Sequence, residues 1–231
     1  MLERWANAGA TAGAGVSVTT RPVDAIVFDL GGVLIEWDPR RLYRKLFDDE
    51  AAMEAFLAEV CTPAWNARQD AGRPWPGAIE SLLREHPEAR DLIVAYDERW
   101  EEMLGDAFPE TVALLDELRR AGVPCYALSN WSSEKFAVAR GHYPFLEWFA
   151  GMVISGEEGV AKPDPAIYRI MLARFGLTPE ATVFIDDLDT NVAVAARLGM
   201  IAIPFRDAVR LRRDLGFLGL PVAPVAHGAN R

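Results

Sequence analysis

Residues 25–33 read Ala-Ile-Val-Phe-Asp-Leu-Gly-Gly-Val, and this stretch decides the fold. Four apolar residues lead to Asp29, and a pair of glycines follows almost at once. A short apolar run bounded by glycines is typical of a buried parallel strand that ends in a tight turn. Open α/β sheets bind their ligands at the carboxyl ends of such strands. The stretch therefore predicts a sheet with Asp29 at its reactive edge, although an Asp before glycine is also ordinary turn chemistry.

Farther along the chain, short apolar runs alternate with amphipathic stretches. The apolar runs predict strands at residues 123–128, 152–154, 182–185 and 200–204. The amphipathic stretches predict helices at residues 109–121, 132–140, 164–176 and 191–198. Strands and helices in alternation imply parallel strands joined by right-handed crossovers. We therefore expect an α/β fold with a three-layer core around a parallel sheet.

The segment from about Asp38 to Met103 differs from the rest, because its apolar residues recur at helical spacing. Helices are expected at residues 40–47, 50–61, 76–85 and 89–104. This all-helical insert follows the first strand, so it should stand over the carboxyl edge of the sheet as a lid on Asp29. The expected division is a flexible leader at 1–21, a core at 22–36 and 105–220, a helical cap at 37–104 and a flexible tail at 221–231.

Composition narrows the class of protein. The 231 residues are 51% hydrophobic, enough for one good-sized core and a smaller inserted domain. The 34 acidic against 24 basic residues give a net charge of −10, which disfavours nucleic acid and anionic membrane as partners. Cys61 and Cys125 have neither metal spacing nor a disulfide framework. No apolar run approaches the roughly 20 residues of a membrane span. A reducing cytoplasm fits the cysteine usage best. We expect a monomer or a homodimer, and the sequence does not decide between them.

Four polar clusters follow strand-like runs, and together they predict a phosphoryl-transfer site. Asp29 could attack phosphorus and carry the phosphoryl group as an aspartyl phosphate, and Gly32 lets the backbone come close to a phosphate. Ser129 and Asn130 offer a hydroxyl and backbone N–H groups to the equatorial oxygens. Lys162, followed by prolines that stiffen its backbone, adds a fixed positive charge.

Asp186 and Asp187 form the fourth cluster, directly after an apolar run. Two adjacent carboxylates repel one another unless a cation lies between them and Asp29. Hard oxygen ligands from separate strand ends suit Mg²⁺. Taken singly, each cluster has an ordinary explanation, such as a turn, a solvated lysine or, for the acidic pair, the N-cap of the next helix. Their order and their common place at strand ends favour the functional interpretation.

These motifs resemble those of a known superfamily. The sequences Asp-x-Gly-Gly-Val, Leu-Ser-Asn, Lys-Pro-Asp-Pro-x-Ile-Tyr and Phe-Ile-Asp-Asp-x-x-x-Asn are similar to the four motifs of the haloacid dehalogenase-like (HAD) hydrolases. The resemblance covers about residues 23–204 and implies a Rossmann-like core. The helical insert resembles the C1 cap of subfamily IA. The Asp-Leu-Gly-Gly variant looks like bacterial sugar-phosphate phosphatases, notably those that act on glucose 1-phosphate.

The resemblance implies a Mg²⁺-dependent phosphatase of a small phosphorylated metabolite, with a sugar phosphate as the first expectation. It makes Asp29 the nucleophile, and Ser129 and Lys162 the groups that stabilise the phosphate or the intermediate. The residues that it implies for the metal are Asp29, the backbone carbonyl of Gly31, Asp187 and, directly or through water, Asp186, with Asn191 behind them as support.

One residue departs from the superfamily's pattern. In its typical phosphatases, the residue two positions after the nucleophile is a second Asp, which protonates the leaving oxygen and then activates water. Here that residue is Gly31. General acid–base help is worth roughly 10² to 10⁴ in rate, so its absence disfavours simple alkyl phosphates. The missing acid is hypothesised to be the substrate, a water, or a carboxylate such as Glu36 or Asp38.

Two other functions stay open. A 2-haloacid dehalogenase also uses an Asp nucleophile but needs no Mg²⁺, and the acidic pair Asp186-Asp187 argues against it. A binding or regulatory domain that has lost its chemistry would explain Gly31. The intact Asp29 and Lys162 weigh against that interpretation.

Substrate choice should depend on residues of the helical cap that face Asp29. Residues 65–72 are interpreted as a polar and aromatic break between two helices. Trp65, Arg68 and Asp70 are candidates to stack on or hydrogen-bond a sugar-like group. The alternative is that Trp65 packs inside the cap while Arg68 and Asp70 form a surface pair. Trp131, directly after Asn130, should border the phosphate, and the other tryptophans are expected to be packing residues.

Overall fold

The computed structural model describes residues 22–224. The predicted leader at 1–21 and most of the predicted tail at 221–231 lie outside the described residues. Within the described part, no helix is long and apolar enough to cross a membrane.

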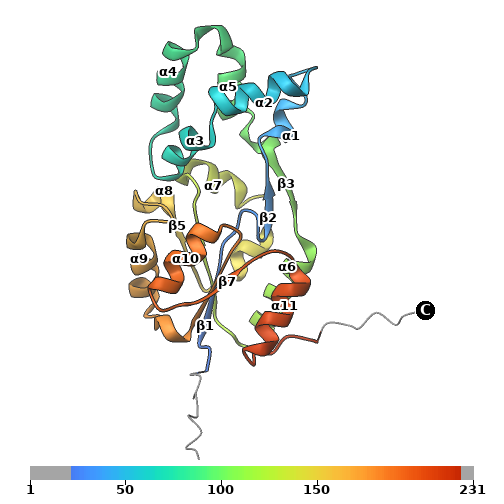
Figure 1. Ribbon diagram of the computed structural model, residues 1–231, viewed down its shortest axis with the longest axis vertical. Coiled ribbons are helices and arrows are strands. Elements are labelled where there is room, and N and C mark those ends of the chain that lie inside the picture. Colours follow the sequence, from blue (N-terminus) through green and yellow to red (C-terminus); the bar gives the residue numbers. More distant parts are fainter. Residues whose placement is uncertain (1–21, 225–231) are drawn as a thin grey trace, which may run out of the picture.

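A five-stranded parallel sheet forms the centre of the molecule (Figure 1). Its strands lie in the order β5 (Gly151–Ile154), β4 (Cys125–Ser129), β1 (Ala25–Phe28), β6 (Thr182–Asp186) and β7 (Ile201–Pro204). The register pairs Phe28 with Ala127 on one side and with Ile185 on the other. The carboxyl ends of the three middle strands therefore meet at one edge, as the sequence predicts.

Helices cover both faces of this sheet. Along β1, Ile26 and Phe28 pack into one hydrophobic cluster while Val27 packs into the other, which is the alternation expected of a strand buried on both sides. The first cluster takes in apolar residues of α6 (Pro109–Arg120) and α11 (Ala208–Phe217), and the second takes in those of α9 (Pro165–Phe175) and α10 (Asp189–Arg197). The predicted three-layer, Rossmann-like α/β core is confirmed.

A helical insertion stands beyond the carboxyl edge of the sheet (Figure 1). A short antiparallel ribbon of β2 (Ile35–Trp37) and β3 (Leu104–Ala107) leads into it and out of it. Its helices are α1 (Arg40–Tyr43), α2 (Glu50–Glu59), α3 (Pro63–Asp70), α4 (Trp75–Glu85), η1 (Pro87–Ala89), α5 (Arg90–Glu98) and η2 (Trp100–Met103). The ribbon was not predicted, because each of its strands has only three or four residues.

Residues 65–70, predicted as a break between helices, are instead part of α3. Thr62 is the N-cap of this helix and accepts a hydrogen bond from the Trp65 N–H, while Pro63 occupies its first turn. These start signals precede a run with few apolar residues, so hydrophobic periodicity did not reveal the helix. A second unpredicted helix is α11, which buries only Leu211 and Leu215.

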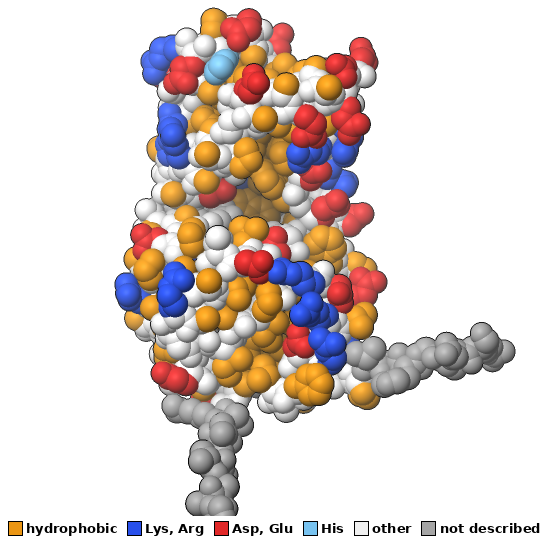
Figure 2. All heavy atoms as spheres, viewed as in Figure 1, with side chains coloured by type: hydrophobic (Ala, Val, Ile, Leu, Met, Phe, Trp, Pro, Cys, Tyr) orange, Lys and Arg blue, Asp and Glu red, His pale blue; other side chains and the backbone are white. Residues whose placement is uncertain are grey.

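The remaining helices are short. They are α7 (Ser133–Ala139), η3 (Pro144–Trp148), α8 (Ser155–Glu158) and η4 (Pro179–Ala181). Two of them, α7 and α8, contact the insertion. Trp75 Nε1 donates to Ser132 Oγ at 2.9 Å, and Lys135 Nζ lies 2.5 Å from Asp97 Oδ1. These contacts hold α4 and α5 against the start of α7. Figure 2 shows the hollow that remains between the insertion and the core.

Candidate active site

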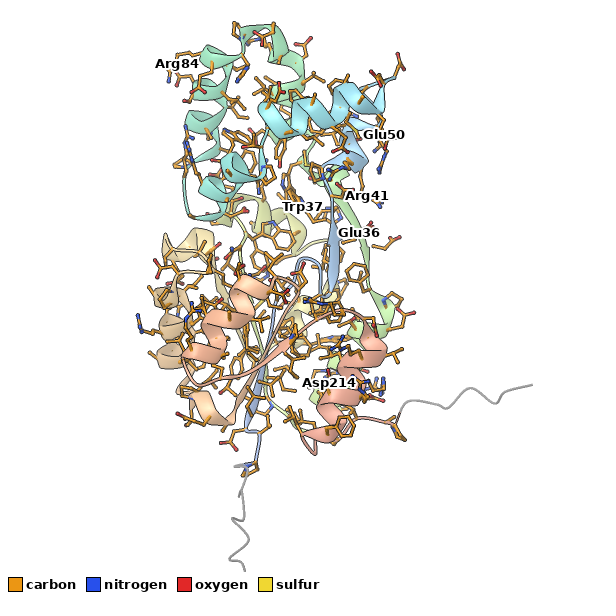
Figure 3. The ribbon with its side chains drawn as sticks, viewed as in Figure 1. Glu36, Trp37, Arg41, Glu50, Arg84 and Asp214 are labelled. Atoms are coloured by element: carbon orange, nitrogen blue, oxygen red, sulfur yellow. The ribbon has the colours of Figure 1, made fainter. Side chains whose placement is uncertain are left out.

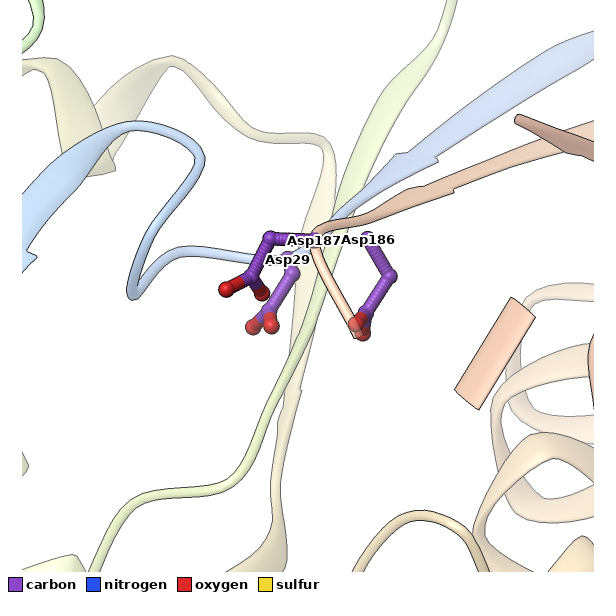
Figure 4. Close-up of side chains that lie close together, drawn as sticks. All are labelled: Asp29, Asp186 and Asp187. Carbon is purple, nitrogen blue, oxygen red and sulfur yellow. The ribbon is translucent and has the colours of Figure 1, made fainter. Parts of the chain in front are cut away.

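Three carboxylates converge at the carboxyl edge of the sheet (Figure 4). Asp29 directly follows β1, Asp186 is the last residue of β6, and Asp187 comes next. Because β1 and β6 are neighbouring parallel strands, their ends lie side by side. One oxygen from each of the three carboxylates lies within 4.8 Å of the others. The structure thus brings together residues that are more than 150 positions apart in the sequence.

Lys162 joins this group from the loop before α9. Its Nζ lies 2.9 Å from Asp29 Oδ2 and 2.7 Å from Asp186 Oδ2, and its side chain is only 1% exposed. Asn130 fixes the backbone of the lysine, since its amide both donates to the Lys162 carbonyl and accepts from the Lys162 N–H, each at 2.8 Å. The lysine is therefore a buried charge in a defined place, unlike a solvated surface lysine.

Asp186 and Asp187 have different surroundings. Asn191 Nδ2 donates to both Asp186 oxygens, at 3.0 and 3.1 Å, and the Leu188 N–H donates to Oδ1 at 2.9 Å. With Lys162 added, the oxygens of Asp186 are largely occupied by the protein. Asp187 is half-buried and less restrained, so it has more freedom to bind a ligand directly.

The turn after β1 brings its backbone against Asp187. Gly32 has a φ of +73°, a conformation that favours glycine, and a Cβ built on it would lie 2.5 Å from Asp187 Oδ2. By contrast, a Cβ on Gly31 would meet nothing within 4 Å. The Leu30 N–H donates to Asp29 Oδ1 at 2.7 Å and so orients the carboxylate.

Burial and like charge shape the protonation of this site. The pKa of Asp29 is raised from 3.8 to about 7, first by burial and then by Asp186 and Asp187, while Lys162 opposes the rise. Burial and Asp186 also raise the pKa of Asp187. Burial lowers the pKa of Lys162, but Asp29 and Asp186 more than offset it, so the net shift is upward. The lysine stays charged, and the excess of carboxylates calls for another cation.

The donor set fits a divalent cation. Three carboxylates face one ammonium group, which leaves two negative charges uncompensated when all are ionised. Carboxylates and a backbone carbonyl are the ligands that Mg²⁺ prefers, usually with several waters. Asp29, Asp187 and the Gly31 carbonyl could hold the ion, with Asp186 close by, and the glycine at position 32 leaves room for the Asp187 carboxylate. A bound cation would also favour the ionised form of Asp29.

Ser129 lies at the end of β4, beside β1, and is buried. The adjacent Asn130 and Trp131 continue the chain along the same edge of the sheet, so the predicted phosphate-holding cluster does lie at the carboxylate edge. Trp131 N donates to Ser155 Oγ at 2.9 Å, which ties this turn to α8.

Two hollows lie near the site, an inner cavity between the insertion and the core and an outer cleft lined by residues of the insertion alone. The inner cavity has a volume of about 80 Å³ and is lined by Gly31, Trp37, Asn66, Asp70, Trp100, Asn130 and Trp131. A larger outer cleft of about 690 Å³ shares Trp37, Asn66 and Asp70 with it and reaches Arg40 and Glu54. Figure 3 shows Trp37 at the junction between the insertion and the core. The inner cavity thus adjoins the turn that follows Asp29.

Asp70 lines this cavity, but the other two predicted cap residues lie elsewhere. Trp65 packs edge-on against Trp75 and Tyr96, with ring centroids 5.7 and 5.2 Å apart, in the core of the insertion. Arg68 is exposed and lines neither hollow. Because residues 65–70 form a helix, Trp65 and Arg68 lie on other faces of α3 than Asp70. An irregular break, as expected from the sequence, gave no reason to separate the three side chains.

The carboxylates suggested as a replacement acid are also placed differently. Glu36 accepts from Arg41 at 2.9 Å in an exposed ion pair and lines neither hollow (Figure 3). Asp38 lines only the outer cleft, where its Oδ1 accepts from the Arg40 N–H at 3.0 Å. Neither one lines the cavity beside Gly31.

Sequence reasoning missed three residues that line the inner cavity. Trp37 and Trp100 were expected to be packing residues, and Asn66 was not singled out. The only sequence signal for Asn66 is its spacing of four residues from Asp70, which places both on one face of α3. Asn66 Nδ2 donates to Asp70 Oδ2 at 2.8 Å.

Comparison with known proteins agrees with this geometry. The family model of the haloacid dehalogenase-like hydrolases matches residues 23–199, most of the chain. The chain belongs to the haloacid dehalogenase-like hydrolases. It is therefore a hydrolase of the HAD type, and the resemblance of its four motifs is confirmed at the level of the superfamily.

Several relatives of this HAD hydrolase are phosphatases. A sesquiterpene phosphatase, astK of Aspergillus oryzae, is 27% identical over 83% of this chain and 94% of its own length. A phosphoserine phosphatase of Thermus thermophilus is 31% identical over 64% of this chain and 61% of its own. A glyceraldehyde 3-phosphate phosphatase of Methanopyrus kandleri is 27% identical over 80% of this chain and 84% of its own.

Solved structures share the fold. A HAD family enzyme of Bacteroides thetaiotaomicron, an aspartate-to-alanine mutant in complex with magnesium and inorganic phosphate, has a TM-score of 0.62 and 25% identity over 80% of this chain and 94% of its own. An L-2-haloacid dehalogenase of Xanthobacter autotrophicus has a TM-score of 0.57 and 19% identity over 88% of this chain and 85% of its own. The second likeness shows the fold alone.

Proposed function

We propose that this HAD hydrolase is a Mg²⁺-dependent phosphatase of a small phosphorylated metabolite. The observation that carries the proposal is the convergence of Asp29, Asp186 and Asp187 on one point, with Lys162 as the buried counter-charge. Such a site offers a nucleophile, a place for a divalent cation and a fixed positive charge, which are the parts that phosphoryl transfer needs. The phosphatases among its relatives support the same reaction class.

In the proposed reaction, Asp29 attacks phosphorus and carries the phosphoryl group as an aspartyl phosphate, which water then hydrolyses. Lys162 and the Ser129 hydroxyl hold the phosphoryl oxygens, with Asn130 and the backbone of Gly32 beside them. Mg²⁺, when bound, neutralises charge on the phosphoryl oxygens and keeps Asp29 ionised. Asn191 and Leu188 N–H hold Asp186 in place. Asp29 is oriented by the Leu30 N–H.

The substrate is proposed to be a sugar phosphate or a similar polyol phosphate. Three tryptophans, two asparagines and an aspartate line the inner cavity. Indole faces suit the apolar faces of a sugar, while amide and carboxyl groups suit its hydroxyls. The cavity of about 80 Å³ holds only the atoms next to the phosphate, so the rest of the substrate would extend into the outer cleft.

The helical insertion is proposed to act as a cap, a domain at residues 37–104 on a core at 22–36 and 105–220. The ribbon of β2 and β3 would be its hinge, because it is the covalent connection between the two parts. Closure would exclude water from the aspartyl phosphate, except for the attacking molecule.

A panel of phosphorylated metabolites, measured with and without Mg²⁺, tests the proposal. Phosphate release that needs Mg²⁺ and is abolished in the Asp29→Asn variant is the expected result. If no phosphorylated compound is hydrolysed, the phosphatase proposal is wrong. If halide is released from a 2-haloacid without added metal, the dehalogenase alternative replaces it.

A further inference from the structure

The inner cavity contains one ionisable side chain. Of its seven lining residues, all in the part of the chain that the structure describes, Asp70 alone can gain or lose a proton near neutral pH. A Cβ on Gly31 would project into open space, since it meets nothing within 4 Å. The core therefore places no side chain in the space beside Gly31. Asp70, from the insertion, lines the same cavity.

Asp70 is held firmly at the end of α3. The Ser132 N–H donates to its Oδ1 at 3.1 Å, and Asn66 Nδ2 donates to its Oδ2 at 2.8 Å. Its backbone carbonyl accepts from Ser155 Oγ. Both side-chain hydrogen bonds stabilise the ionised carboxylate, which is the form that remains after an acid has given up its proton.

Unpartnered polar atoms at the cavity point to a ligand. Asn66 is 8% exposed and Trp131 is 6% exposed, yet Asn66 Oδ1 and Trp131 Nε1 have no hydrogen-bond partner among the described residues. Leaving a buried polar group unpaired costs about 1 to 3 kcal/mol. Both residues line the cavity, so a hydroxyl group bound there could donate to Asn66 Oδ1 and accept from Trp131 Nε1.

Resting on the proposed phosphatase function, we propose that Asp70 is the catalytic acid and base of this enzyme. It would protonate the leaving oxygen of the substrate and then take a proton from the attacking water. The acid thus comes from the helical insertion rather than from the turn after the nucleophile. The leaving group would lie in the inner cavity, between Asn66 and Trp131.

The proposed reaction has two steps. In the first, a bond forms between an Asp29 oxygen and phosphorus, the bond from phosphorus to the leaving oxygen breaks, and the proton of the Asp70 carboxyl group moves to that oxygen. An alcohol leaves, and Asp70 is ionised. In the second, water attacks phosphorus, the bond to Asp29 breaks, and the proton lost by the water returns to Asp70. Phosphate leaves, and both carboxyl groups are restored.

The surroundings of Asp70 suit this role. Burial raises its pKa from 3.8 to about 7, although the Ser132 N–H opposes the shift. Ser132 and Ser155 contact this end of α3 from neighbouring elements. Tyr96 of α5 is also close, and its pKa is raised first by burial and in part by Asp70. Glu134 and Lys135 of α7 contact Trp75 close by. An acid that titrates near neutral pH can both give and take a proton.

Leaving-group dependence distinguishes a proton donor from a structural residue. The Asp70→Asn variant should lose about 10²- to 10⁴-fold in kcat/KM toward an alkyl phosphate such as a sugar 6-phosphate. Toward 4-nitrophenyl phosphate, whose leaving group departs without a proton, the loss should be less than about tenfold. The matched control is Asp97→Asn, which removes another contact between insertion and core, the ion pair with Lys135. Its ratio of the two activities should equal that of the unaltered protein.

A rescue experiment makes the assignment specific. Because position 31 has open space for a side chain, Gly31→Asp combined with Asp70→Asn should restore at least part of the alkyl phosphatase activity. Should Asp70→Asn fail to fold, the unaltered protein carries the test. Its activity toward the alkyl phosphate should fall as pH rises above about 7, while the fall should be weaker with 4-nitrophenyl phosphate.

An unchanged ratio of alkyl to nitrophenyl activity in folded Asp70→Asn would overturn the assignment and make Asp70 a structural link between α3 and α7. So would identical pH profiles for the two substrates. If the unaltered protein hydrolyses neither ester, it is the proposed phosphatase function that fails, and the assignment fails with it.

Discussion

At the residue scale, Gly32 shows how closely the backbone approaches the acidic cluster. Gly32→Ala should weaken Mg²⁺ binding and lower activity at least tenfold, because its Cβ would lie 2.5 Å from Asp187 Oδ2. Gly122→Ala is the control, since Gly122 has a similar φ of +81° but no atom within 4 Å of the added Cβ. In both variants the alanine must adopt a left-handed backbone conformation, which costs about 1 to 2 kcal/mol. Titration calorimetry with Mg²⁺ should separate them, and equal affinities would contradict this geometry.

Lys162 is the second residue whose effect can be predicted. Lys162→Met leaves Asp29 and Asp186 without their buried counter-charge, so the metal-free protein should lose about 3 to 5 kcal/mol in its free energy of unfolding. Arg84→Met removes an exposed ion pair with Glu80 and should cost less than about 1 kcal/mol. Urea unfolding without Mg²⁺ measures both, at about pH 8, where Asp29 with its pKa of about 7 is mostly ionised. A small loss for Lys162→Met would mean that the two carboxylates are not both ionised beside it.

At the element scale, α8 packs against the start of α7 only because residue 156 is glycine. A Cβ there would lie 2.4 Å from Ser133 N and 2.8 Å from the Trp131 carbonyl oxygen. Gly156→Ala should therefore displace the turn that carries Asn130 and Trp131, and lower both melting temperature and activity. Gly77→Ala, in the first turn of α4 with open space around it, should instead raise stability by about 0.5 to 1 kcal/mol. A folded Gly156→Ala protein with full activity would contradict this packing.

The strand ends could be predicted from the sequence, whereas helix α3 and the inner cavity could not. The ends of β1, β4 and β6 were predictable because short apolar runs, Gly turns and polar strand ends are local signals. Helix α3 was not, since half of its residues are polar and one of its packing partners, Tyr96, is distant in sequence. The inner cavity forms only when α3 meets the turn at Gly31 and the residues after β4. Asp70 could be named as a candidate from sequence, but its place beside Gly31 could not.

At the scale of the whole molecule, burial of carboxyl groups links stability to pH. The folded state raises the pKa of Asp70 from 3.8 to about 7, so between these values it binds more protons than the unfolded state. This contribution to stability is present at low pH and is lost as pH rises toward about 7. Asp70→Asn should therefore show a weaker decline in melting temperature between about pH 5 and about pH 8. An unchanged decline would show that Asp70 titrates normally.

On this reading of the site, Asp29 accepts the phosphoryl group within a cluster of carboxylates that holds one divalent cation. The most direct test is to mix the protein with Mg²⁺ and a hydrolysed phosphate ester, quench with acid during turnover, and locate the phosphoryl group by peptide mass spectrometry. Asp29 should be phosphorylated, and no phosphorylation should be found in the Asp29→Asn variant or without Mg²⁺. A phosphoryl group on any other residue, or steady hydrolysis with Asp29 never modified, would contradict it.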